Sequence, residues 1–132
     1  MPVGSDFTTI YFGEHLGTNE ADLSAPWAKF VGNQSSHREF NVGNPPTSAA
    51  YMLIQTLNVG VLSHRIYING IKLDGYQISQ HPGWSMWMIV IPEGKLKHGA
   101  NILQIVRDET SSGSFVVGHV VVHWREVVNF PS

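Results

Sequence analysis

Apolar residues in this chain occur in short runs separated by turn residues, and this pattern constrains the fold more than any other feature. No stretch of a dozen residues keeps the 3.6-residue period of an amphipathic helix. The runs are rich in Val, Ile, Thr and aromatic residues, and 13 Gly and 7 Pro punctuate them. Seven or eight short strands with frequent turns are typical of an antiparallel β-sandwich or barrel. We therefore expect an all-β antiparallel β-sandwich with under ~10% helix.

The expected strands are distributed along the whole chain. Their bounds are Asp6–Gly13, Trp27–Gly32, Ala49–Leu57, Arg65–Ile68, Ile71–Leu73, Trp84–Ile91, Asn101–Arg107 and Ser114–Val128. Asn69-Gly70 is a strong two-residue hairpin turn. We expect Gly17–Pro26 to be a loop with room for one helical turn at Asn19–Leu23, and Asn33–Pro46 to be a loop with one edge strand.

Length and composition fit one ordered domain, residues 1–132, because 42% of the residues are hydrophobic and only 14% are charged. Eight Lys and Arg against ten Asp and Glu give a net charge of -2, so we expect neither nucleic acid nor a membrane surface as a partner. The absence of Cys excludes disulfides and a thiolate nucleophile. Met1–Gly13 lacks the basic and apolar blocks of a signal peptide, which predicts a cytoplasmic location.

Two of the expected strands are apolar on both faces, Trp84–Ile91 and Ser114–Trp124. In an ordinary sandwich the outer face of each strand carries polar residues. Either loops or a second subunit must cover the additional apolar surface. Because the loops are short, we expect a homo-oligomer.

Histidine, at seven positions, is the first residue type to consider for metal binding or catalysis. His119 and His123 have the spacing of a helical zinc motif, but their segment is predicted to be a strand. On a strand they lie on one face, roughly 13 Å apart, which is too far for one metal ion. We therefore expect no metal and no cofactor.

Other common catalytic patterns are missing from the sequence. There is no Gly-x-Ser-x-Gly elbow and no glycine-rich phosphate loop that opens a helix. The acidic residues lie mostly in loops, and nothing in the sequence pairs two of them as a glycosidase requires. Histidine acting as a general acid or base on a small organic substrate remains open.

Alternation along the strands predicts one polar and aromatic face. On the last strand, inward Val116, Val120, Val122 and Trp124 would leave Val117, His119, Val121, His123 and Arg125 outside. The same alternation leaves Gln104 and Tyr67 outside, with Trp84 or Trp87 nearby. Gly118 could mark a bulge that breaks the alternation. The candidate ligand-binding residues are His119, His123, Gln104, Tyr67 and Trp87.

The segment from His64 to Glu126 carries a recognisable sequence phrase. Its parts are Ile66-Tyr67-Ile68-Asn69-Gly70, then Gly99 and Asn101-Ile102-Leu103-Gln104-Ile105, then Val117 to Glu126. This phrase resembles the galactose-binding-like jelly roll and, more narrowly, a small prokaryotic domain family of unknown function. The resemblance implies binding of carbohydrate or another polar ligand, often with a structural calcium ion, although the chain shows no acid-rich calcium loop.

Three function classes follow from these observations. The first is a binding module for a carbohydrate or other small polar ligand, since aromatic rings beside hydrogen-bonding groups suit a sugar. The second is a metal-independent enzyme that uses His119 or His123. The third is a structural domain that buries its apolar outer face against copies of itself.

Overall fold

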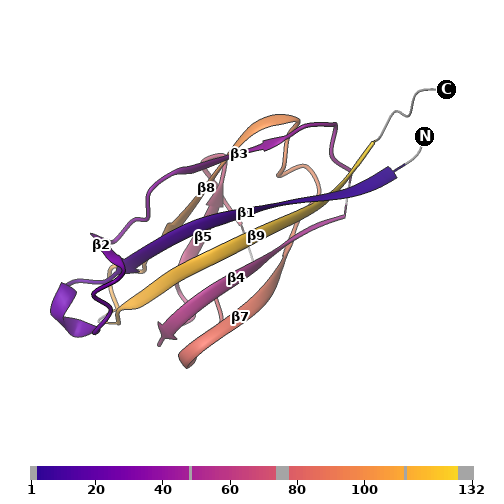
Figure 1. Ribbon diagram of the computed structural model, residues 1–132. Helices are drawn as coiled ribbons and strands as arrows, with labels where there is room; N and C mark the ends of the chain where they lie inside the picture. The colour runs from indigo at the N-terminus through magenta and orange to yellow at the C-terminus, as the bar shows by residue number, and fades with distance from the viewer. Residues whose placement is uncertain (1–2, 48, 74–77, 112, 128–132) are drawn as a thin grey trace.

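The computed structural model is a sandwich of two β-sheets and describes residues 3–47, 49–73, 78–111 and 113–127 (Figure 1). The larger sheet has the strand order β2-β1-β9-β4-β7. Its strands are β1 (Val3–Leu16), β2 (Lys29–Gly32), β4 (Ala50–Val59), β7 (His81–Ile91) and β9 (Phe115–Val127).

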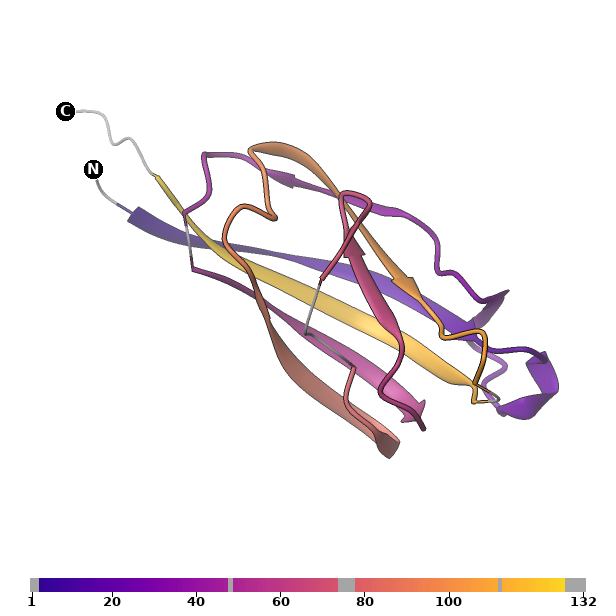
Figure 2. The ribbon, with the colours of Figure 1, turned by 180° about the vertical axis from the view of Figure 1, so that it is seen from behind.

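The smaller sheet has the strand order β3-β8-β5-β6; it lies behind the larger one in Figure 1 and in front of it in the reverse view of Figure 2. Its strands are β3 (Arg38–Val42), β5 (Arg65–Ile68), β6 (Ile71–Lys72) and β8 (Gly99–Val106). A 3-10 turn at Glu20–Asp22 is the only helical element among the residues described. No helix in that part of the chain is long and apolar enough to cross a membrane.

The predicted fold class is confirmed, and the strand bounds differ mainly at the ends. The first strand is longer than expected because β1 keeps pairing with β9 from Val3 to Leu16. The strand pairs are antiparallel except for β1 and β2, which pair in parallel. The helical turn forms inside the expected Asn19–Leu23 segment. Val128, the expected end of the last strand, lies outside the described residues.

The core lies between the two sheets and is built from the inward residues of nearly every strand. Fully buried examples are Ile54 on β4, Ile66 on β5, Leu103 on β8 and Val120 on β9. Burying one such side chain contributes about 1.5–3 kcal/mol. The cumulative gain holds the sheets together without any disulfide.

Two asparagines connect the β5–β6 turn to the start of β8. Asn69 and Gly70 have positive φ angles of 55° and 78°, as an Asn-Gly hairpin turn requires. The buried Asn101 accepts hydrogen bonds from the Lys97 N–H and the Asn69 amide, and it donates to the Lys97 and Gly99 carbonyls. The Asn-Gly phrase in the sequence is therefore a structural corner.

The expected alternation on β9 is wrong at one end. Val117 was expected outside and Val116 in the main core, but Val117 lies in the main core. Val116 instead packs beneath the loop residues Ala25 and Ala28 on the outer face. The reason is a β-bulge: Ile54 pairs with Val120 but Thr56 pairs with Val117, so β9 contains one additional residue around Gly118.

Candidate functional site

The predicted ligand-binding residues divide between two opposite faces, which corrects the single face expected from the sequence. His119 and His123 lie on β9, on the outer face of the larger sheet. Tyr67 and Gln104 pair with each other across β5 and β8, on the outer face of the smaller sheet. The outward direction of these four residues is as the alternation predicts, but the sequence does not show which strands share a sheet.

Trp87 is a second correction, because it does not lie beside the histidines on the outer face. It alternates with the exposed Met86 and Met88 on β7 and packs against the main core. Its indole N–H is buried without a hydrogen-bond partner. Trp84 is the β7 tryptophan on the outer face, where its ring stacks on Trp27 with centroids 5.6 Å apart.

His123 is the centre of a row of three rings across β1, β9 and β4. The register places His123 opposite both Phe7 and Tyr51. Its ring stacks on Tyr51 with centroids 4.6 Å apart and an interplanar angle of 12°, and on Phe7 at 5.6 Å. Phe7 remains 60% exposed, so the row is open to a ligand.

A second row on the same face contains His119. Its ring lies 4.7 Å from the ring of the exposed Tyr11, and its Nδ1 lies 3.3 Å from Gln55 Oε1. The same oxygen accepts a hydrogen bond from the His119 backbone N–H at 3.1 Å. Gly118 makes this possible, because a Cβ there would collide with the Gln55 amide.

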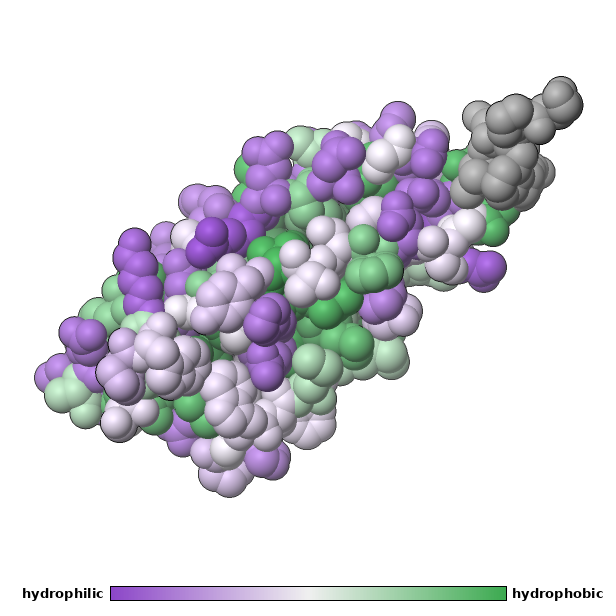
Figure 3. All heavy atoms as spheres, in the orientation of Figure 1, coloured by the Kyte–Doolittle hydropathy of each residue, from purple (hydrophilic) through white to green (hydrophobic). Residues whose placement is uncertain are grey.

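We call the five ring residues of these rows the aromatic platform. Its members are Phe7, Tyr11, Tyr51, His119 and His123. Figure 3 looks onto this side of the molecule and shows white and green atoms across its middle, with purple atoms more frequent toward β3. The sequence pattern did not identify four residues of this surface as candidate site residues: Phe7, Tyr11, Tyr51 and Gln55. Alternation predicts that they point outward, but only the register brings them to the histidines.

A cavity of about 330 Å³ adjoins the platform at His123. Its lining residues are Ser5, Ala49, Tyr51, His123, Trp124 and Arg125. Aromatic side chains therefore line this cavity together with a serine and an arginine. This combination offers an apolar surface together with hydrogen-bond donors and acceptors at its rim.

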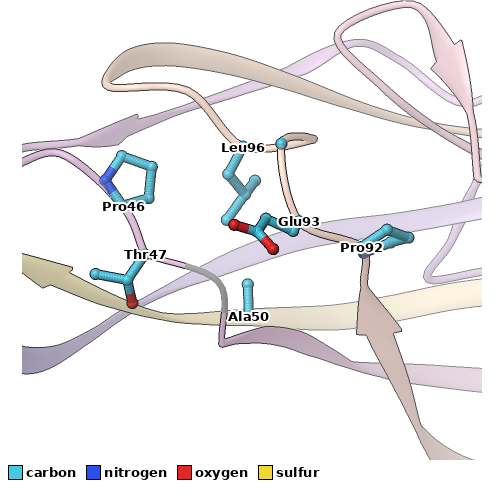
Figure 4. Close-up of a pocket in the computed structure, with 7 residues that line it drawn as sticks. Pro46, Thr47, Ala50, Pro92, Glu93 and Leu96 are labelled. Carbon is cyan, nitrogen blue, oxygen red and sulfur yellow. The ribbon is translucent and has the colours of Figure 1, made fainter.

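A second, smaller cavity of about 210 Å³ lies between Pro46, Thr47 and Ala50 on one side and the turn after β7 on the other (Figure 4). Pro46, Ala50 and Leu96 give it apolar walls, and the Glu93 carboxylate points into it. It lacks an aromatic ring. The first cavity is therefore the better candidate for recognition of a ligand with both apolar and polar surfaces.

A buried polar cluster at His64 is structural and does not belong to either cavity. His64 stacks on Phe115 at 4.1 Å, and its Nδ1 accepts the Asp108 backbone N–H at 3.0 Å. Burial, with a smaller effect from Arg107, lowers the pKa of His64 to about 4, although Asp108 opposes the shift. Hydrogen bonds from Ser63 and Thr110 lower the pKa of Asp108 to about 2.

Arg107 completes this cluster as a fully buried cation. Its Nε donates to the Gly113 carbonyl at 2.8 Å and its Nη1 to Asn33 Oδ1 at 2.9 Å. Its Nη2 donates to the Ser111 carbonyl. These oxygens replace the water that the guanidinium loses, and they fix the loop between β8 and β9.

The described residues lack the acid-rich cluster of a typical calcium site. Calcium takes six to eight oxygen ligands from carboxylates, backbone and amide carbonyls and water. Within residues 3–47, 49–73, 78–111 and 113–127, no group of three or more His, Cys, Asp or Glu side chains could hold a metal. The platform itself consists of rings, with the Gln55 amide beside His119, so its chemistry is stacking and hydrogen bonding.

The solved structures similar to this chain share its fold. One is the crystal structure of the CBM36-1 domain of a multidomain xylanase from the hindgut metagenome of Trinervitermes trinervoides. Its TM-score is 0.59 at 9% sequence identity, and the match covers 95% of this chain and 100% of that chain. A carbohydrate-binding module CBM36 in complex with calcium and xylotriose has a TM-score of 0.53 at 12% identity, covering 86% and 97%. The protein is therefore a jelly-roll β-sandwich with the fold of carbohydrate-binding modules.

The chain belongs to the family of unknown function DUF7383, which matches residues 4–126. This confirms the resemblance to a domain family of unknown function. A ruminal GH26 endo-β-1,4-mannanase also shares the fold, with a TM-score of 0.53 at 15% identity. The match covers 95% of this chain but only 26% of the mannanase. No curated protein matches the chain in sequence.

Proposed function

We propose that this protein is a carbohydrate-binding module and that the aromatic platform is its binding surface. The observation that carries the proposal is the open row Phe7–His123–Tyr51, whose rings stack on one another next to the 330 Å³ cavity. A sugar would lie across the exposed side of this row, with its C–H groups against the rings.

The chemistry of a sugar ring matches this surface. Each ring has an apolar face of C–H groups and an edge of hydroxyls, so it needs a flat aromatic partner with donors and acceptors beside it. Tyr51 and His123 give the aromatic partner, and Ser5 and Arg125 line the adjoining cavity. The cavity volume is at the lower end of the ~300–1,000 Å³ range of small-ligand sites.

The fold supports the same ligand class. Two similar structures are carbohydrate-binding modules by name, and one of them holds xylotriose. In the part of the chain that the structure describes, neither platform histidine has a carboxylate hydrogen-bond partner. No observation therefore favours catalysis by His119 or His123 over binding.

The test is calorimetric titration with xylo-, manno- and cello-oligosaccharides. We expect binding of at least one series, and Tyr51→Ala should weaken it about tenfold or more, which corresponds to about 1.4 kcal/mol of lost stacking. His123→Ala should act in the same direction, since it removes the middle ring of the row.

Tyr67→Ala is the matched control, because Tyr67 is a partly exposed tyrosine on the opposite outer face. It should leave the affinity unchanged. The proposal is wrong if none of the three oligosaccharide series binds, or if Tyr67→Ala weakens binding as much as Tyr51→Ala does.

A further inference from the structure

The four edge strands of the sandwich differ in how they are protected. β2 has four residues and carries Lys29, and β6 has two residues and carries Lys72. β3 has five residues and carries Arg38 and Glu39. Short length and charge are the usual devices that keep edge strands from pairing with other chains. Each of these three edge strands is short, and each carries at least one charged residue.

β7 is the fourth edge strand and has neither protection. It has eleven residues, and none of them is Lys, Arg, Asp or Glu. It pairs with β4 on one side, and no described strand pairs with its other side. Only Pro82, near its start, lacks a backbone N–H. A long uncharged edge of this kind is a template for another strand.

The outer side chains of β7 add apolar surface to the open backbone. Trp84, Met86, Met88 and Val90 alternate along the strand and are between 46% and 63% exposed. At ~150–200 Å² for each large side chain, they offer roughly 300–400 Å² per protomer. This is about half of the ~800 Å² per partner in a standard interface, before the paired backbone is added.

We propose that β7 pairs antiparallel with β7 of a second copy, so that two larger sheets form one continuous ten-stranded sheet. A two-fold axis perpendicular to the sheet generates this contact and closes it at two copies. Such an axis places the residue nearest to it opposite its own copy, so a charge at that position would face a like charge. From Trp84 to Ile91 there is none.

This geometry has a consequence for binding, which rests on the proposed function. The same axis keeps both outer faces on one side, so the dimer presents two aromatic platforms to one surface. A polymer that reaches both platforms gains avidity from effective concentration, whereas a short oligosaccharide does not.

Disulfide trapping tests the contact directly, because the natural chain contains no Cys. Single Cys variants at Trp84, Met86, Met88 and Val90 are oxidised alone and in pairwise mixtures, then separated without reductant. Two residues that face each other in an antiparallel pair lie within disulfide reach. The residue two positions further along each strand is roughly 13 Å from its own copy, because the two strands run in opposite directions. We expect one position, or one mixed pair, to give most of the dimer.

Two control positions distinguish this arrangement from others. Leu53→Cys lies in the middle of the outer face, and Ile102→Cys lies on the smaller sheet. Preferential linkage of Leu53→Cys would mean that outer faces stack on each other, which overturns the proposal. Equal linkage at all positions would mean random collision, and it overturns the proposal as well.

Sedimentation of the unmodified chain supplies the second test, over concentrations from ~10 to ~500 μM, where an interface of this size should assemble. We expect a monomer–dimer equilibrium. Met86→Lys/Met88→Lys should shift it at least tenfold toward monomer, while Ile102→Lys should leave it unchanged. Circular dichroism confirms that each variant is folded.

A wild-type monomer at every concentration would overturn the proposal, and the open edge would then suit a strand from a different protein. Neither result depends on sugar binding. Failure of the dimer therefore leaves the platform proposal intact, and failure of binding leaves the edge contact intact.

Discussion

His64 shows how burial decides the role of a residue type that occurs seven times in this chain. His119 and His123 lie on the outer face, packed against partly or largely exposed rings. His64 is only 2% exposed and lies beside the buried cation Arg107. Its imidazole is neutral and accepts the Asp108 N–H, so it stabilises the loop after β8.

The lowered pKa of His64 predicts acid sensitivity. The folded-state pKa is about 4 and the ordinary value is 6.5, so the unfolded chain binds the proton more tightly. The free energy of unfolding should therefore be highest above pH 6.5 and fall as the pH drops toward 4. At ~1.4 kcal/mol per pKa unit, His64 accounts for at most about 3 kcal/mol of this loss.

Urea unfolding between pH 7.5 and 4 measures this dependence. His64→Asn keeps an acceptor for the Asp108 N–H but does not titrate, so it should flatten the pH profile. Some dependence of the unfolding free energy on pH should remain in His64→Asn, because burial also lowers the pKa of His15. His37→Asn, at an exposed histidine, is the control and should keep the full slope. An unchanged slope in His64→Asn would contradict the prediction.

At the scale of the element, β9 decides where the candidate site lies. It pairs with both β1 and β4, and its bulge at Gly118 changes which valines enter the core. Beyond the bulge the alternation is regular, so His119 and His123 share one face. The same glycine leaves space for Gln55 to contact His119.

Gly118→Ala should displace the Gln55 side chain, because the new Cβ would overlap its amide group. The lost hydrogen bond to the His119 N–H should cost about 0.5–1.5 kcal/mol. Since Gln55 is the group displaced, Gly118→Ala/Gln55→Ala should be less destabilised than the sum of the two single variants.

Thermal and urea unfolding of the three variants provide this comparison. Gly113→Ala serves as the control, because its Cβ would meet nothing within 4 Å and it should unfold like the natural chain. Strict additivity of the Gly118 and Gln55 changes would show that the two residues do not interact.

At the scale of the whole molecule, the two outer faces are chemically different. The larger sheet presents the aromatic platform and the uncharged β7 edge, whereas the edges of the smaller sheet carry Arg38, Glu39 and Lys72. The fold is shared with carbohydrate-binding modules, but the ligand chemistry depends on the side chains of this chain.

We expect sugar binding to be independent of calcium. The platform offers rings and tyrosine hydroxyls, with the Gln55 amide beside them, and these groups can contact a sugar without a metal ion. The described residues do not form a carboxylate cluster of the kind found in acid-rich calcium sites. Titration after treatment with EDTA should give the same affinity as titration in added calcium. A tenfold loss with EDTA, restored by calcium, would contradict this expectation.

The sequence by itself determined the all-β class, most strand positions and the outward direction of His119, His123, Gln104 and Tyr67. These properties are local, because turn residues and a two-residue alternation are encoded within each strand. The alternation failed at Val116 and Val117, where a bulge needs a partner strand to define it.

Only the tertiary structure decided which outward residues meet. Strand order places Gln104 and Tyr67 on one sheet and the two histidines on the other. Register brings Phe7 and Tyr51 next to His123, although they are about 115 and 70 residues away from it in sequence. Strand order likewise places the apolar strand β7 at the edge of the larger sheet, where its outer backbone groups can pair with another strand. Strand pairing is a long-range property, fixed by how all the inward side chains fill one core, and no single segment contains that information.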